Sequence, residues 1–184
     1  MLFSKGANIC SNCWLAQGMA VEINFDGIPR DLALESAELF LERIPVDKNI
    51  QKNINRRKKM LLADMDSTIL QIETLDVIGH AIGKAREIAE ITEKAMNGDI
   101  DFEAALKNRV KLLAGVNINQ LIEFVLEKLL ITQGANTLVK TMKANGATTA
   151  LVSGGFTVIT EIIREKLNFD LSYGKTLVVD SSIV

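Results

Sequence analysis

The sequence is poor in the residues that build disulfide scaffolds and zinc centres. Its 184 residues include two cysteines, two prolines and one histidine. The cysteines, Cys10 and Cys13, are spaced as C-x-x-C, which suits half of a zinc site or a redox pair. Because there is no second pair and the histidine is distant, at His80, we interpret them as ordinary thiols near a chain end.

The chain also lacks a marked charge excess and a long apolar run. The net charge is −2, which gives no support to a nucleic-acid or membrane-surface partner. No stretch reaches the ~18 apolar residues of a membrane span. The first residues do not resemble a secretion signal, so we expect a cytoplasmic protein. We interpret the basic run at residues 56–59 as a solvated linker rather than a binding patch.

What is present is enough apolar sequence for a real core, since 48% of the residues are hydrophobic. The length suits one domain with a small companion. Residues 1–55 are predicted to form a small β-α-β module, with strands at 19–25 and 46–53 around a helix at 31–44. A polar linker follows at 48–59.

From residue 58 onward the pattern changes to that of an α/β domain. Apolar runs at 60–63 and 148–152 are typical of buried parallel strands. The segment from about 72 to 145 is predicted to be helical almost throughout, and another helix is expected at 157–167. We therefore predict a Rossmann-like parallel sheet with an inserted helical cap, over residues 58–184.

Acidic and glycine-rich sequences follow the two strands. Asp64 and Asp66 come at the carboxyl end of the first strand, where ligands bind in open α/β sheets. Two such carboxylates need a cation between them or a proton on one of them, which suits magnesium binding and acid catalysis. A surface turn is the alternative, and spacing alone leaves both open. Ser153, Gly154 and Gly155 after the second strand can cradle an anion, so the two sites together favour a phosphate ester bridged by a metal.

These motifs resemble the first two signatures of the haloacid dehalogenase-like phosphatases. Residues 64–68 read D-M-D-S-T and residues 152–156 read V-S-G-G-F. With Glu73 and the run N-G-D-I-D-F-E-A-A-L-K-N-R-V at 97–110, the chain is similar to the phosphoserine phosphatases of that family. The resemblance implies a magnesium-dependent hydrolase that converts O-phospho-L-serine into serine and phosphate, the last step of serine biosynthesis.

The resemblance also implies a role for each matching residue. Asp64 would attack phosphorus and form an aspartyl-phosphate, and Asp66 would act as general acid and then general base. The Asp64 carboxylate and the Asp66 carbonyl would hold Mg²⁺. Ser153 and the Gly154 N–H would bind the phosphoryl oxygens.

In the cap, the resemblance implies four contacts with the substrate. Glu73 would meet its ammonium group and Arg109 its carboxylate, which a guanidinium can pair bidentately. Met96 and Phe102 would line or close the pocket and exclude water. The alternatives are that Glu73 and Arg109 are solvated helix residues and that Met96 and Phe102 belong to the core.

The family's later signatures, a lysine and a Gly-Asp-rich acidic loop, have no match before residue 184. Lys166 and Lys175 follow too closely after Ser153 to match that lysine, and Asp180 does not begin such a loop. We therefore expect a C-terminally truncated phosphatase. The alternatives are an inactive or ligand-binding relative and a phosphatase for another small phosphate ester. The sequence carries no signal for the oligomeric state.

Overall fold

The computed structural model describes residue 2 and residues 5–184. Contacts divide the chain into two compact units, Met1–Arg57 and Lys58–Val184. Each unit has its own sheet, and each is described by itself below. Within the described residues, no helix has both the length and the apolar character needed to cross a lipid bilayer.

The first unit is a hairpin followed by a helix. Strands β1 (Asn8–Ala16) and β2 (Ala20–Asp26) pair antiparallel, and α1 (Arg30–Leu41) follows. The predicted β-α-β order is therefore wrong, because residues 46–53 form no strand and the partner of β2 precedes it. A hairpin closes through a tight turn, here at Gly18 with φ of 71°, so local pairing is favoured over pairing across the helix.

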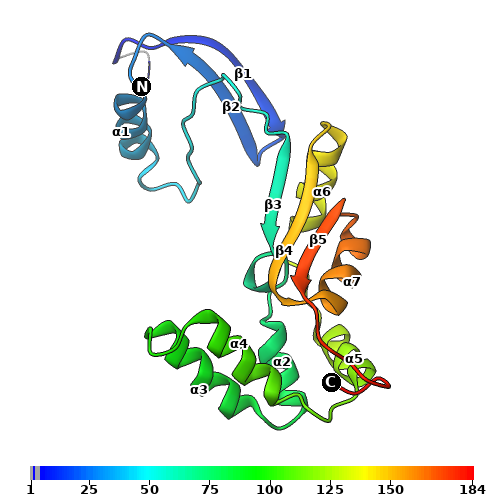
Figure 1. Cartoon of the computed structure of the whole chain (residues 1–184). Helices are drawn as coiled ribbons and strands as arrows, with labels where there is room; N and C mark the ends of the chain where they lie inside the picture. Colours follow the sequence, from blue (N-terminus) through cyan, green and yellow to red (C-terminus); the bar gives the residue numbers. More distant parts are fainter. Residues whose placement is uncertain (1, 3–4) are drawn as a thin grey trace. The chain divides into compact units, whose positions relative to one another are not determined.

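The second unit contains the predicted parallel sheet (Figure 1). Strands β3 (Met60–Asp64), β4 (Thr148–Phe156) and β5 (Leu171–Lys175) lie in that order, and α7 (Thr157–Leu167) connects β4 to β5. Both strand pairs are parallel, so their carboxyl ends lie at one edge. The expected α/β fold class is confirmed.

Four helices follow β3 before the chain returns to the sheet (Figure 1). They are α2 (Thr74–Ala81), α3 (Ala85–Met96), α4 (Phe102–Lys111) and α5 (Ile118–Lys128), and α2 packs against both α3 and α5. The next helix, α6 (Ala135–Ala144), packs against β4 and β3 instead. The inserted cap therefore ends before α6, earlier than the range predicted from the sequence.

The two connections between cap and sheet lie side by side. Leu70 and Ile131 form an antiparallel bridge. The Gln71 N–H donates to the Leu130 carbonyl at 2.8 Å. The cap is thus joined to the sheet by a paired neck at residues 69–71 and 130–132, which limits the directions in which it can move.

Among the described residues, one face of the sheet is covered much more fully than the other. Ala63 and Leu151 are buried in a core that includes side chains of α6 and α7. On the opposite face, Leu62 is 65% exposed and Tyr173 is 58% exposed. Alternation along each strand explains this, because neighbouring side chains point to opposite faces.

Candidate active site

Asp64 ends β3 and is followed by a tight turn over residues 65–69. Met65 and Ile69 are buried and anchor the turn. Ser67 lies in the left-handed region at φ of 50°. This turn leaves the Asp64 carboxylate exposed, with the Thr68 hydroxyl donating to its Oδ2 at 3.4 Å. Asp64 is therefore accessible to a substrate or a cation.

Asp66 is held from two sides. The main-chain N–H of Thr74, at the start of α2, donates to Asp66 Oδ1 at 3.0 Å. The Ser153 hydroxyl donates to Asp66 Oδ2 at 3.4 Å. Burial raises the pKa of Asp66, as do the nearby carboxylates of Glu73 and Asp64, while the hydrogen bonds from Thr74 oppose the increase. A carboxyl that holds its proton more firmly than usual suits general acid catalysis.

The last residues of β4 meet Asp66 because of the strand register. Asp64 pairs with Val152, so Ser153 is one step beyond it at the same edge. The Gly155 N–H donates to Ser153 Oγ at 2.9 Å. A Cβ on Gly155 would lie 3.3 Å from Asp66 Oδ2 and 3.1 Å from Ser153 Oγ. Glycine at this position thus lets the turn after β3 and the end of β4 approach closely. Asp66 and Ser153, which meet there, are 87 residues apart in the sequence.

Phe102 reaches this edge from the cap. Asp101 caps α4 by accepting from the Ala104 N–H at 2.7 Å, which places Phe102 at the first helical position. Its Cζ lies 3.5 Å from the point that a Cβ on Gly154 would occupy. Phe102 is 58% exposed, so it covers the glycine loop without being a core residue.

Glu73 lies beside the turn, and Arg109 lies further along the cap. The Ser67 hydroxyl donates to Glu73 Oε1 at 2.6 Å, which joins the glutamate to the turn after Asp64. Arg109 is half-buried on α4, and its Nε donates to the Ala105 carbonyl at 3.3 Å. Among the described residues Arg109 forms no ion pair, so its outer nitrogens remain open to an anionic group.

Met96 lies at the end of α3, where it is 83% exposed. It borders an open groove of about 480 Å³ with Asp76, His80 and Glu93. The role that the resemblance gives Met96 in closing the substrate pocket stays a prediction.

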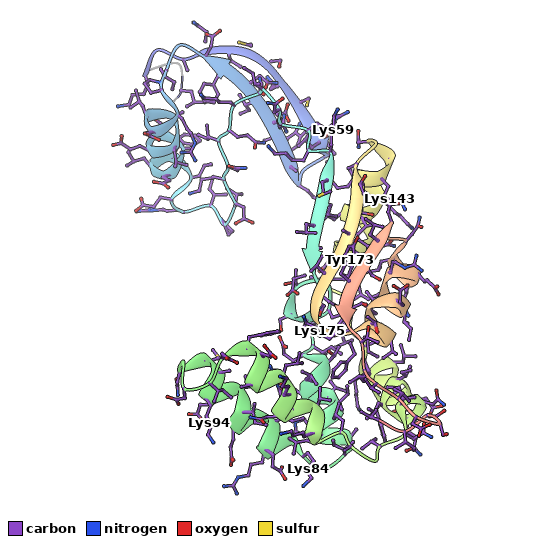
Figure 2. The ribbon with its side chains drawn as sticks, viewed as in Figure 1. Lys59, Lys84, Lys94, Lys143, Tyr173 and Lys175 are labelled. Atoms are coloured by element: carbon purple, nitrogen blue, oxygen red, sulfur yellow. The ribbon has the colours of Figure 1, made fainter. Side chains whose placement is uncertain are left out.

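Sequence reasoning set one charged side chain at this edge aside, because Lys175 follows too closely after Ser153 to match the family's lysine. Lys175, labelled in Figure 2, ends β5. Its Nζ lies 6.0 Å from the centre of the Phe102 ring. The register pairs Lys175 with Phe156, just after the glycine loop. Lys175 could have been found by predicting a further parallel strand after the helix at 157–167. The last residue of such a strand is expected at the same edge as Asp64, because parallel strands end at a common edge.

The fold and the site together define a class of protein. The chain belongs to the haloacid dehalogenase-like hydrolase family, whose pattern it matches over residues 61–184.

Within this family the similar proteins include many phosphoserine phosphatases. That of Archaeoglobus fulgidus is 35% identical over 142 residues, which are 76% of this chain and 41% of the relative. That of Methanocaldococcus jannaschii is 36% identical over 126 residues, which are 68% of this chain and 59% of the relative. The chain thus spans about half the length of the curated relatives it matches.

Solved structures lead to the same group. A phospho-aspartyl intermediate analogue of a phosphoserine phosphatase matches with a TM-score of 0.63 and 35% identity, over 70% of this chain and 61% of that one. A probable phosphoserine phosphatase from Vibrio cholerae matches with a TM-score of 0.70 and 32% identity, over 89% of this chain and 50% of that one.

Proposed function

We propose that this protein hydrolyses O-phospho-L-serine to L-serine and phosphate. The observation that carries the proposal is the pairing of an exposed Asp64 with a half-buried Asp66 whose pKa is raised, at the carboxyl edge of the sheet. One carboxylate is free to attack, and the raised pKa of the other suits it to deliver a proton to the leaving group. The similarity to phosphoserine phosphatases supports the choice of substrate.

The reaction has two balanced steps. In the first, Asp64 Oδ attacks phosphorus, the bond from phosphorus to the seryl oxygen breaks, and Asp66 gives its proton to that oxygen. In the second, Asp66 removes a proton from water, which attacks the aspartyl-phosphate and releases phosphate and free Asp64. Ser153 Oγ and the Gly154 N–H would bind the phosphoryl oxygens, where fixed donors stabilise the charge of the transition state.

The donors at this edge suit magnesium. Mg²⁺ prefers oxygen ligands, takes one or two carboxylates and keeps several waters. The resemblance assigns the Asp64 carboxylate and the Asp66 main-chain carbonyl as protein ligands. Among the described residues there is no group of three or more His, Cys, Asp or Glu that could hold a metal. When bound, the ion would offset the negative charge of the phosphate and the carboxylates.

Two cap residues would recognise the amino-acid part of the substrate. Glu73 would accept from the ammonium group, and Arg109 would pair with the carboxylate. Phe102, over Gly154, would limit the access of water to the intermediate. The place in serine biosynthesis rests on the resemblance and, like the cytoplasmic location expected from the sequence, belongs to the same proposal.

The proposal is tested by assaying phosphate release from O-phosphoserine in the presence and absence of Mg²⁺. We expect Mg²⁺-dependent release by the full chain and a loss of at least ~10³-fold in Asp64→Asn, because the nucleophile is removed. Asp47→Asn, at an exposed position of the first unit, is the matched control. Equal release by Asp64→Asn and the unmodified protein would contradict the proposal.

The same assay separates the alternative, a phosphatase for another small ester. Arg109→Ala should reduce hydrolysis of O-phosphoserine far more than that of a sugar phosphate, which has no carboxylate. Equal losses on both substrates would favour the alternative.

A further inference from the structure

The segment after β5 runs from the sheet to the cap. Residues 176–184, which we call the strap, leave the carboxyl end of β5 and reach the loop between α4 and α5, as the red segment in Figure 1 shows. Leu177, near the start of the strap, is buried in the core of the second unit, and Val184 packs against the same core. The strap therefore gives the cap a second connection to the sheet besides the neck.

Backbone hydrogen bonds attach the strap to the cap. The Val184 N–H donates to the Val116 carbonyl at 3.1 Å, and the Val184 carbonyl accepts from the Gly115 N–H at 3.0 Å. The Ile118 N–H donates to the Ser182 carbonyl at 2.9 Å. Ile118 is the first residue of α5, so this bond also satisfies an N–H group that a helix start leaves without an intrahelical partner. The strap and the α4–α5 loop thus form a short antiparallel pair.

The strap changes direction through a turn that its sequence does not favour. Asp180 and Ile183 exchange backbone hydrogen bonds at 2.9 and 2.8 Å. Ser181 and Ser182 lie between them, and both have positive φ, at 47° and 71°. Two-residue loops with positive φ favour Asn-Gly or Gly-Gly, because a Cβ is strained there. The pairing with the cap therefore offsets a local strain that would be relieved when the strap is released.

The strap and α4 leave a groove between them. The groove has a volume of about 390 Å³, and apolar side chains of both segments line it, among them Leu106 and Val110 of α4 and Leu177 and Val178 of the strap. Because the strap does not fill the space beside α4, the backbone pairing at residues 115–118 is its firm attachment to the cap. A few hydrogen bonds can break and re-form on the timescale of lid motions.

We propose that the strap is a latch that holds the cap over the carboxyl edge of the sheet, and that its release from residues 115–118 lets the cap turn about the neck. Phe102 of the cap covers Gly154 at this edge, so release of the latch would uncover the glycine loop. Rigid-body turning about a few loop residues is a common form of domain closure. The inference goes beyond the proposed function, because it concerns the motion of the cap and holds for any substrate at that edge.

The test measures the distance between the cap and the sheet in the full chain. Spin labels at Lys94→Cys on α3 and Lys166→Cys on α7 occupy exposed positions, and the exposed Cys10 and Cys13 are changed to serine. Double electron–electron resonance should give one narrow distance distribution for this labelled protein. Val184→Pro removes a donor to the cap and should add a second distance, from molecules in which the cap has turned away.

Hydrogen exchange distinguishes release of the latch from unfolding of the cap. In Val184→Pro, the Gly115 and Ile118 amides should exchange about tenfold faster, the effect of losing one backbone hydrogen bond. The Gln71 amide of the neck should exchange at an unchanged rate. Val184→Ala keeps the N–H donor and is the matched control, so its amides should exchange as in the unmodified protein.

A second variant should tighten the latch. Ser181→Asn combined with Ser182→Gly gives the turn the sequence that its backbone favours. The Gly115 and Ile118 amides should therefore exchange more slowly than in the unmodified protein, while the Gln71 amide of the neck is again unchanged.

Three outcomes would overturn the proposal. If Val184→Pro speeds exchange at Gly115 but leaves the label distances unchanged, the strap is released without any effect on the cap. If exchange at Gln71 accelerates by the same factor, the variant unfolds the cap instead of releasing it. If neither exchange nor distance changes, the pairing does not hold the strap. None of these outcomes depends on the hydrolysis of O-phosphoserine, so the proposed function is tested separately.

Discussion

Asp66 occupies a position where chemistry and stability oppose each other. Its carboxyl is half-buried beside two other carboxylates, which raises its pKa. A raised pKa means that the folded chain binds this proton more tightly than the unfolded chain does. Ionised Asp66 therefore destabilises the fold at neutral pH, and the same feature suits the residue for proton transfer.

Asp66→Asn should be more stable than the unmodified protein at neutral pH and should lose phosphatase activity. The asparagine oxygen can still accept from Thr74, so the hydrogen bond at the start of α2 is retained. The destabilisation caused by ionised Asp66 is absent below pH 3.8, the ordinary pKa of the group, and it grows as the pH rises through the raised pKa of the folded state. Urea unfolding from pH 3.5 to 7 measures it.

Asp47→Asn is the control for this prediction, since Asp47 is exposed and lies in the first unit. Its unfolding free energy should follow that of the unmodified protein at every pH. If the unfolding free energies of Asp66→Asn and the unmodified protein differed by the same amount at every pH from 3.5 to 7, the role given to burial of Asp66 would be contradicted.

At the scale of elements, Asp170 lies just before β5 and joins this strand to β4 and α6. Its carboxylate accepts from the Thr149 N–H at 2.8 Å and the Thr149 hydroxyl at 2.9 Å, both on β4. Lys143 at the end of α6 pairs with it at 2.7 Å. The Lys143 ammonium and the Thr149 donors lower the pKa of Asp170 to about 2. This cluster positions β5, and hence Lys175, against β4.

Asp170→Asn should lower the melting temperature at neutral pH, because the ionised carboxylate is the form that Lys143 and Thr149 stabilise. This contribution is fully present above pH 3.8 and is lost as the pH falls through about 2. The difference from the unmodified protein should therefore shrink between pH 5 and pH 2.5, as followed by circular dichroism.

Glu165→Gln is the matched control. Glu165 pairs with Arg164 on the exposed side of α7, where an ion pair contributes little. A change in melting temperature as large as that of Asp170→Asn would show that any lost ion pair has this effect, and would contradict the role given to the Asp170 cluster.

At the scale of the whole molecule, the two units are joined by a basic segment. Arg56 still belongs to the first unit, where it pairs with Glu22. Arg57, Lys58 and Lys59 are exposed and lie outside any helix, and β3 begins at Met60. Because the contacts divide the chain at this point, we propose that each unit is a separate domain.

Limited trypsin treatment should therefore cut first after Arg57, Lys58 or Lys59, which mass spectrometry of the fragments can show. Changing all three residues to glutamine should delay this cut and leave the slower cuts unchanged. First cleavage inside the cap, at Lys107 or Lys111 for example, would contradict the proposed division.

Several parts of this fold could be predicted from local sequence because local forces produce them. The apolar runs before Asp64 and Ser153 form strands, as expected, and the segment between them holds the expected helices. The β1–β2 hairpin was not predicted, because β1 is exposed along most of its length and has no apolar alternation. The prediction that α6 belongs to the cap was wrong. An apolar stripe indicates that a helix is packed, but it does not indicate which neighbouring element the helix packs against.

The sequence by itself determined that Asp64 ends a strand, that Asp66 follows in a turn and that a glycine-rich segment ends another strand, since strand periodicity and turn chemistry act over a few residues. That β3 is largely exposed, and not buried as its apolar run predicts, was decided by its place at the edge of the sheet. Only the tertiary structure decided which side chains meet at that edge. Phe102 lies over Gly154, Met96 borders a groove with Asp76 and His80, and the Lys175 ammonium lies 6.0 Å from the centre of the Phe102 ring. Those distances depend on the strand register and on the packing of the cap, which join residues far apart in the chain.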